Sequence, residues 1–248
     1  QTGLWPYGIS GDVPIAMEWI GIEGLRGKGL AALALAPFRL ASALWQAGRI
    51  LRRRRPAAVL GMGGFASGPG GLMARALGLP LVIHEQNRVP GLTNQWLARI
   101  AARVFEAFPG SFPPGLGAIA CGNPVRAEIA ALPPPEERLA ARLQGLGPRR
   151  LLVLGGSLGA QALNQALPPA LMKIPAERRP QVRHQAGERT LAEAESGYAR
   201  AGVAAEGTPF IADMAEAYAW ADLVVCQAGA LTVSELAAVD SAPILVPY

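Results

Sequence analysis

The feature that most constrains this sequence is a repeated unit, in which a continuous apolar run leads through a turn of small residues into a helix-like stretch. The unit occurs at three turns, 61–71, 155–160 and 227–235. Each turn follows an apolar run, at 57–60, 151–154 and 222–225 respectively. Uninterrupted apolar strands that alternate with helices are typical of parallel sheets covered on both faces. The sequence therefore predicts an α/β fold built from parallel sheets.

The same alternation continues elsewhere and indicates two Rossmann-like domains in series. Further strands are expected at 81–83, 103–107, 118–121, 181–184 and 244–246, and helices at 70–78, 92–103, 158–171, 188–200 and 231–239. The alternation breaks at 132–148, where prolines and glycines cluster around a short helical stretch. We predict a first domain over 1–125, a linker over 126–148 and a second domain over 149–248.

Composition excludes several classes of protein. A chain that is 51% apolar and 17% charged can bury a core, which argues against disorder. The start at Gln1 shows no secretory pattern, and no uncharged apolar run reaches the length of a membrane span. Cys121 and Cys226 lie outside any zinc or redox motif, so we expect reduced thiols and no metal. Both ends of the sequence look truncated, so we expect the chain to be a fragment of a longer protein.

Positive charge is concentrated in the first half of the chain. Residues 26–103 contain 12 Lys or Arg and a single acid, whereas residues 126–248 contain 11 bases and 13 acids. This asymmetry predicts an anionic partner for one half only, such as phosphates, nucleic acid or an anionic membrane surface. The apolar stretch 30–47, within basic residues 26–55, fits either a helix lying on such a membrane or a helix covering the core. Pro37 is expected to kink or split it.

The three small-residue turns are candidate phosphate sites. Glycines let the backbone approach a ligand, and free N–H groups at a helix start attract anions. Gly61-x-Gly63-x-x-Ala66 also matches the relaxed dinucleotide fingerprint, so an NAD-dependent oxidoreductase is a rival interpretation, and a plain tight turn is another. Ligands of open α/β sheets bind at the carboxyl ends of strands, where all three turns are expected.

Polar residues follow two other strands. His84-Glu85-Gln86-Asn87 comes directly after 81–83, and Arg126 follows the strand at 118–121. Buried polar groups need partners, which a sugar or peptide ligand would supply, but taken alone a polar loop and a surface arginine are the favoured explanations. The run Arg52 to Arg55 admits an RNA-binding module, but it lacks the interleaved aromatic residues that stack on bases.

Seven motifs in this order together resemble the MurG family of UDP-N-acetylglucosamine:undecaprenyl-diphosphoryl-muramoyl-pentapeptide N-acetylglucosaminyltransferases: 25–29, 61–71, 84–87, 90–94, 122–126, 155–161 and 229–235. The resemblance implies the GT-B fold, with two Rossmann-like domains facing a cleft. It implies transfer of GlcNAc from UDP-GlcNAc to the C4 hydroxyl of MurNAc in lipid I, with inversion, to give lipid II for peptidoglycan synthesis. It also implies a peripheral protein on the cytoplasmic face of the bacterial inner membrane, without cofactor, metal or nucleic acid.

The resemblance implies a role for individual residues. Ser157 and its loop would hold the donor diphosphate, Ile211 would meet uracil through its backbone, and Asn87 and Arg126 would contact the donor. The start of the last predicted helix would face the α-phosphate through Ala230, Leu231, Thr232, Val233 and Ser234, and Glu235 would accept the ribose hydroxyls. The acceptor diphosphate would meet Gly63, Gly64, Ser67 and Gly68.

The resemblance leaves three matters open. The catalytic base is unassigned, with His84 as the candidate, because the family's histidine-bearing first loop is missing from this sequence. Phe65 stands where the family has Tyr, and Gln227 stands where Arg is common, which puts one phosphate contact in doubt. We expect residues 1–248 to be inactive alone. The alternative is another GT-B nucleotide-sugar transferase with a different acceptor.

Overall fold

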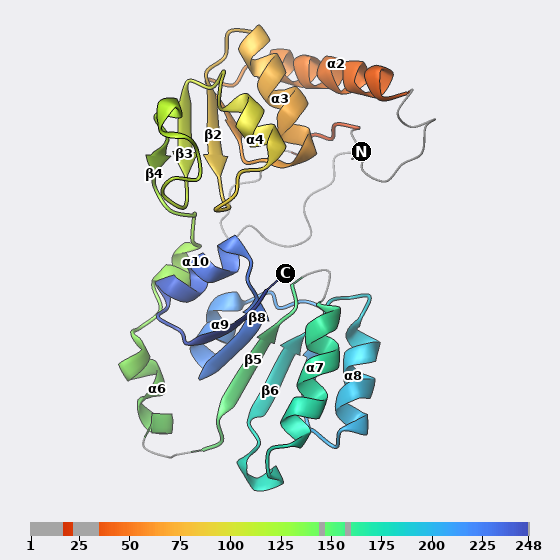
Figure 1. Ribbon diagram of the computed structural model, residues 1–248, viewed down its shortest axis with the longest axis vertical. Coiled ribbons are helices and arrows are strands. Elements are labelled where there is room, and N and C mark those ends of the chain that lie inside the picture. The colour runs from red at the N-terminus through yellow and green to blue at the C-terminus, as the bar shows by residue number, and fades with distance from the viewer. Residues whose placement is uncertain (1–16, 22–34, 144–146, 157–159, 248) are drawn as a thin grey trace. The chain divides into compact units, whose positions relative to one another are not determined.

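The computed structural model describes residues 17–21, 35–143, 147–156 and 160–247 and divides the chain into two compact units. The first unit spans 1–123 and the second spans 124–248 (Figure 1). Among the described residues, no helix combines the length and the apolar composition that crossing a bilayer requires.

The described part of unit 1 is a parallel sheet with its helices. Its strands lie in the order β1-β2-β3-β4, the same order as in the sequence. The elements are α2 (Ala36–Arg54), β1 (Val59–Gly61), α3 (Gly64–Ala76), β2 (Leu81–Glu85), α4 (Leu92–Leu97), β3 (Arg103–Glu106), a 3-10 turn η1 (Pro114–Leu116) and β4 (Ile119–Ala120). Leu81, Ile83 and Val104 from the strands are buried together with Leu97 and Phe112.

Two helices of unit 1 correct the sequence prediction. Pro37 lies in the first turn of α2, where its missing N–H costs no helical hydrogen bond, so the helix runs unbroken to Arg54 instead of kinking. Helix α3 begins at Gly64 rather than at residue 70. Most of the glycine-rich stretch is therefore helical, and a Cβ at Gly71 would lie 2.8 Å from the Leu97 side chain. Glycine at this position allows α3 to pack closely against α4.

Unit 2 is a five-stranded parallel sheet in the order β7-β6-β5-β8-β9. Its strands are β5 (Arg150–Leu154), β6 (Gln181–Gln185), β7 (Glu206–Thr208), β8 (Leu223–Gln227) and β9 (Pro243–Val246). Its helices are α5 (Ala127–Ala130), α6 (Pro135–Leu143), α7 (Gln161–Met172), a 3-10 turn η2 (Ala176–Arg178), α8 (Leu191–Arg200), α9 (Met214–Trp220) and α10 (Ala230–Ala238). The sequence prediction did not include β7 and α9.

Both faces of this sheet are buried, as predicted for continuous apolar strands. Leu152 and Val224 pack on one face with Tyr218 of α9 and Leu236 of α10. The alternate strand residues pack on the other face against α7 and α8, and they are Leu151, Val153 and Val225. The α/β class predicted from the sequence is confirmed.

Helices α5 and α6 lie in the stretch that was predicted as a linker. Helix α5 packs against α9 and α10. Arg138 of α6 donates to the carbonyl oxygens of Tyr218, at 3.2 Å, and of Val239. A guanidinium at the carboxyl ends of α9 and α10 also complements their helix dipoles. Both helices of this stretch thus contact unit 2.

Candidate functional site

In the sheet of unit 2, the order of the strands reverses at β5. The chain runs from β5 outward to β6 and β7 and then returns to add β8 and β9 on the other side of β5. In such sheets the loops after the two strands at the reversal diverge and leave a ligand crevice at the carboxyl ends. Leu154 of β5 is in register with Cys226 of β8. The turns that begin at Gly155 and Gln227 therefore leave from neighbouring strand ends. Their position at the carboxyl ends of strands agrees with the sequence prediction.

The turn after β5 has no room for a side chain at its first residue. The Gly155 N–H donates to the Gln185 carbonyl oxygen at 2.9 Å, and a Cβ on Gly155 would lie 2.9 Å from that oxygen and from the Ala160 nitrogen. Gly156 has a φ of +75°, which favours glycine. Ser157, predicted to bind the donor diphosphate, lies outside the described residues.

The turn after β8 leads directly into α10. Gly229 precedes the first helical residue, Ala230, and the first turn carries no acidic side chain. The Ser234 hydroxyl donates to the Ala230 carbonyl oxygen at 2.9 Å, so this predicted ligand contact also binds its own helix. The amino end of a helix favours an anion because its N–H groups and dipole point there. Leu231 is exposed, and Thr232 and Val233 are half-buried.

Glu235 of α10 is held by side chains from two other parts of unit 2. Its Oε1 accepts from Arg126 Nη2 at 3.1 Å, and its Oε2 accepts from the Tyr218 hydroxyl at 2.9 Å. The structure thereby brings together two residues predicted to bind the donor, 109 positions apart. Burial, followed by the neighbouring Glu235 carboxylate, raises the pKa of Tyr218, so the hydroxyl remains a donor. Tyr218 was not predicted, because nothing near it in sequence marks it.

Two further side chains of unit 2, those of Ile211 and Cys226, pack against or within its core. Ile211 follows β7, and its partly buried side chain packs against the core on the α9 and α10 face. Its predicted backbone contact with uracil stays a prediction. Cys226 is buried at the end of β8, and burial raises the pKa of its thiol to about 11. A thiol of that pKa stays protonated at neutral pH and is a poor nucleophile.

In unit 1, the polar run after β2 is satisfied by the chain itself. Glu85 is buried, and its carboxylate accepts from the Asn87 backbone and side chain, the Gly91 N–H and the Asn94 side chain, at 2.9 to 3.1 Å. Glu85 therefore has its partners without a ligand, in agreement with the polar-loop interpretation of this run. Asn87 is exposed, and its amide nitrogen is bound to Glu85, which leaves its amide oxygen facing away from that bond.

His84 presents no ring nitrogen to the surface. Its Nε2 lies 3.0 Å from the Gly122 carbonyl oxygen, so Nε2 carries the proton. Its Nδ1 is buried and has no hydrogen-bond partner among the described residues. A base at this position would have to be uncovered first. The assignment of His84 as the base stays a prediction.

The predicted acceptor loop is shorter than expected. Gly63 and Gly64 have φ values of +86° and +77°, so the turn requires glycine at both positions. Ser67 and Gly68 lie inside α3, and the Ser67 hydroxyl donates to the Gly63 carbonyl oxygen. The loop thus reduces to a two-glycine turn that opens a helix.

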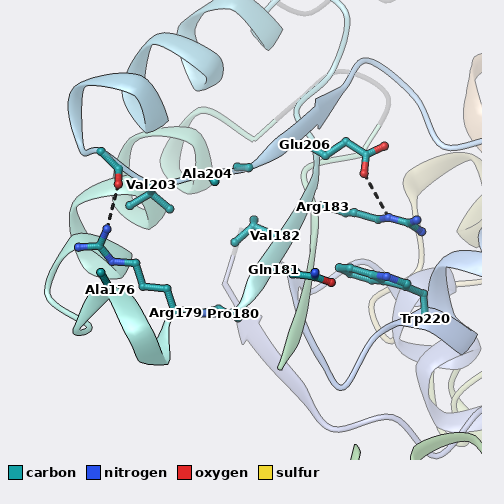
Figure 2. Close-up of a pocket in the computed structure, with 12 residues that line it drawn as sticks. Ala176, Arg179, Pro180, Gln181, Val182, Arg183, Val203, Ala204, Glu206 and Trp220 are labelled. Atoms are coloured by element: carbon teal, nitrogen blue, oxygen red, sulfur yellow. Dashed lines mark hydrogen bonds and ion pairs between the residues drawn. The ribbon is translucent and has the colours of Figure 1, made fainter. Parts of the chain in front are cut away.

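A cavity of 640 Å³ lies at the opposite, amino end of β6 and β7 in unit 2 (Figure 2). Its charged groups are already paired. Arg183 lies 3.3 Å from Glu206, 2.9 Å from Glu216 and 4.4 Å above the Trp220 ring, and Arg179 donates to the Gly202 carbonyl oxygen. The candidate site is therefore placed at the carboxyl ends. Within the described ranges, no group of His, Cys, Asp and Glu side chains gathers to hold a metal ion.

Two Rossmann-like units, one with a sheet reversal beside the amino end of a helix, are typical of a class of protein, the GT-B glycosyltransferases. Models of the glycosyltransferase family 28 N-terminal and C-terminal domains match residues 7–106 and 150–248. The chain belongs to this family and, within it, to the MurG family.

Two curated relatives carry the same name. A UDP-N-acetylglucosamine--N-acetylmuramyl-(pentapeptide) pyrophosphoryl-undecaprenol N-acetylglucosamine transferase of Marinobacter nauticus is 57% identical over 97% of this chain, and one of Xanthomonas axonopodis pv. citri is 58% identical over 96%. The chain spans 65% and 54% of their lengths. The crystal structure of Acinetobacter baumannii MurG is similar at a TM-score of 0.68, with 42% identity, and the match covers 96% of this chain and 65% of that one.

Proposed function

We propose that this chain belongs to an inverting transferase that moves GlcNAc from UDP-GlcNAc to the C4 hydroxyl of MurNAc in lipid I, forming lipid II. The observation that carries the proposal is the pairing of the β5 and β8 strand ends beside the start of α10. The shared name of these two curated relatives supports this donor and this acceptor.

Unit 2 would bind the donor. The glycine turn after β5, with Ser157, would surround the diphosphate, and the start of α10 would face the α-phosphate. Glu235 would accept the ribose hydroxyls, Arg126 beside it would add positive charge, and the backbone at Ile211 would meet uracil. In unit 1, the Asn87 amide, fixed by Glu85, would contact the donor sugar.

The reaction would form one bond and break one. The acceptor O4 attacks the anomeric carbon of GlcNAc from the face opposite UDP, a base takes the O4 proton, and the bond from that carbon to the diphosphate oxygen breaks. The leaving diphosphate gains negative charge. N–H dipoles at the start of α10 and at the glycine turn are preorganised to stabilise that charge.

A calorimetric titration of the chain with UDP-GlcNAc tests the donor half of the proposal. We expect UDP-GlcNAc to bind more tightly than UDP-glucose and UDP-GalNAc, and NAD to show no binding. Glu235→Leu removes the proposed ribose contact and weakens binding about tenfold or more, because a hydrogen bond to a charged group is lost. Glu188→Leu changes an exposed glutamate of the same unit and serves as control. Equal binding of all three sugar nucleotides would contradict the proposal.

For unit 1 we propose contact with an anionic membrane surface. Large aromatic residues are exposed on three helices that pack in sequence, namely Phe38 and Trp45 of α2, Phe65 of α3 and Trp96 of α4. Arg49 lies 5.6 Å from the Trp45 ring, and Arg99 lies 4.6 Å from the Trp96 ring. Exposed aromatic rings beside arginines are typical of helices that lie at a membrane interface.

Flotation with lipid vesicles tests this contact. We expect the chain to float with phosphatidylglycerol vesicles and not with phosphatidylcholine vesicles, and lipid I in the vesicles should increase the bound fraction. The double change Phe38→Ser and Trp45→Ser should weaken binding about tenfold or more, because two large apolar side chains leave the interface. Met172→Ser, an exposed apolar position of unit 2, is the matched control. Equal retention on RNA would contradict the proposal.

A further inference from the structure

Glu235 has one inner and one outer carboxylate oxygen. The inner Oε2 accepts from Tyr218, which is fully buried on α9, and the outer Oε1 accepts from Arg126, whose side chain is 42% exposed. The Glu235 side chain itself is 19% exposed. The carboxylate therefore lies at the boundary between the core and solvent, with its buried side fixed by a neutral hydroxyl.

The Tyr218 hydroxyl is suited to fix this carboxylate. Its ring is enclosed by the core on the α9 and α10 face, and the carbonyl oxygen of the same residue accepts from Arg138 at 3.2 Å. A tyrosine has only two side-chain torsions, so a packed ring places its hydroxyl with little freedom. A glutamate without such a partner would sample several rotamers before it could accept a ligand hydroxyl.

We propose that Tyr218 is a positioning residue that orients Glu235 and thereby makes the nucleotide site selective for a ribose bearing its 2′ and 3′ hydroxyls. The inference rests on the proposed function, because it takes UDP-GlcNAc as the ligand of this site. It adds a residue outside the expected contact set, on a helix that the sequence did not predict. Arg126, on the exposed side, can move aside or share Oε1 with the ribose, whereas Tyr218 stays in place.

The test compares two ligands that differ only at the ribose. Dissociation constants are measured for UDP and for 2′,3′-dideoxy-UDP, with the chain and with Tyr218→Phe, which removes only the hydroxyl. We expect the unchanged chain to prefer UDP by about tenfold or more, the effect of hydrogen bonds to a charged group, and the variant to prefer it about threefold or less. A general loosening of unit 2 would weaken both ligands alike and leave the ratio unchanged.

Tyr198→Phe is the matched control. Tyr198 is also buried in unit 2, but its hydroxyl lies 3.0 Å from His184 Nδ1 on the other face of the sheet. The control loses a buried hydroxyl of the same kind and should keep the full preference for UDP. If Tyr218→Phe keeps that preference as well, the proposal is overturned.

A second pair of variants covers the case in which Tyr218→Phe does not fold. In Glu235→Gln, the amide oxygen can still accept from Tyr218, which directs the amide NH₂ outward to the ribose. Glu235→Leu has no polar group. We expect Gln to retain a measurable preference for UDP over the dideoxy ligand and Leu to have none, and equal ratios would overturn the proposal. An unchanged chain that binds no UDP at all would instead overturn the proposed function.

Discussion

The two units differ in the residues found at the carboxyl ends of their strands. In unit 1 the strand ends are filled by the chain: Glu85 at the end of β2 accepts four N–H groups, and Glu106 at the end of β3 accepts from the Gly110 and Phe112 amides at 2.7 and 3.0 Å. These two carboxylates are register neighbours in the sheet. In unit 2 the corresponding ends of β5 and β8 carry Gly155, Gly156 and Gly229.

The difference lies in what binds at each strand end. In unit 1 each acid is bound by the segment that follows its own strand: Glu85 by donors within 87–94, and Glu106 by donors within 110–112. In unit 2 the order of the strands reverses and the loops after β5 and β8 diverge. The Gly155 N–H is bonded to the Gln185 carbonyl oxygen at 2.9 Å, and the Gly229 N–H to the Gln227 carbonyl oxygen at 2.8 Å. The same α/β plan thus gives one edge with buried acids at its strand ends and another whose turns carry glycines.

The largest effect on stability is expected from removing Glu85, a buried acid at a strand end of unit 1. Glu85→Ala leaves several donors near β2 without an acceptor, two of them from Asn94 and Gly91, and should destabilise unit 1 by about 4 kcal/mol. Urea unfolding with hydrogen-exchange mass spectrometry of peptides in 79–98 measures it. Glu188→Ala, at an exposed position, should cost less than about 0.5 kcal/mol. A Glu85 variant as stable as this control would break the comparison.

The next largest effect concerns the two glycines of the turn after β5 in unit 2. Gly155→Ala brings a Cβ to 2.9 Å from backbone atoms on two sides and should cost about 3 kcal/mol, with loss of UDP binding. Gly156→Ala meets no atom within 4 Å and strains only its φ of +75°, at a cost of about 1 kcal/mol. Thermal unfolding ranks the two variants. The reverse ranking would show that the turn after β5 is not closely packed.

A third prediction separates the units by pH. Burial lowers the pKa of His184 from 6.5 to about 4, so the unfolded chain binds its proton first as the pH falls. The stabilisation is complete above pH 6.5 and is lost toward pH 4, and by pH 5 unit 2 should lose about 2 kcal/mol. Urea midpoints at pH 7.5 and 5.0 measure this. His184→Leu should flatten the dependence, and an unchanged slope would assign it to other groups.

The smallest effect tests a local contact in unit 2. The Asp213 carboxylate accepts from the Glu216 N–H at 2.8 Å and caps α9, the helix that carries Tyr218. Asp213→Ala should cost about 1 kcal/mol, and Asp213→Asn should recover most of it, because asparagine also caps helices. The denaturant midpoints of the unchanged chain and of the two variants test this prediction. Equal loss in both variants would mean that charge, rather than the cap, matters.

Much of the fold could be predicted because each buried strand carries its own apolar signal. The misses have local causes in two elements and a tertiary cause in a third. The three residues of β7, Glu206 to Thr208, form no apolar run, and α9 is only seven residues long. The glycines of α3 favour a turn by local propensity, but the packing of Gly71 against Leu97 makes this stretch helical.

Part of the candidate site could also be predicted from the sequence, and part of it could not. The position of the turns after β5 and β8 at strand carboxyl ends follows from a general rule of open sheets, so it could be predicted. The pairing of β5 with β8 became known only from the structure. The internal use of Glu85, and the contact of Tyr218 with Glu235, depend on side chains from different elements meeting in the fold. Nothing in the local sequence distinguishes Tyr218 from an ordinary core tyrosine.

Trp220 has a consequence for experiments on unit 2. It is the single tryptophan between residues 124 and 248, and two guanidinium groups lie near its ring, with Arg183 at 4.4 Å and Arg150 at 5.6 Å from the ring centroid. Indole emission depends on nearby charge. Replacing the other four tryptophans would leave one native fluorophore whose spectrum reports when this half of the molecule loosens, without any attached dye.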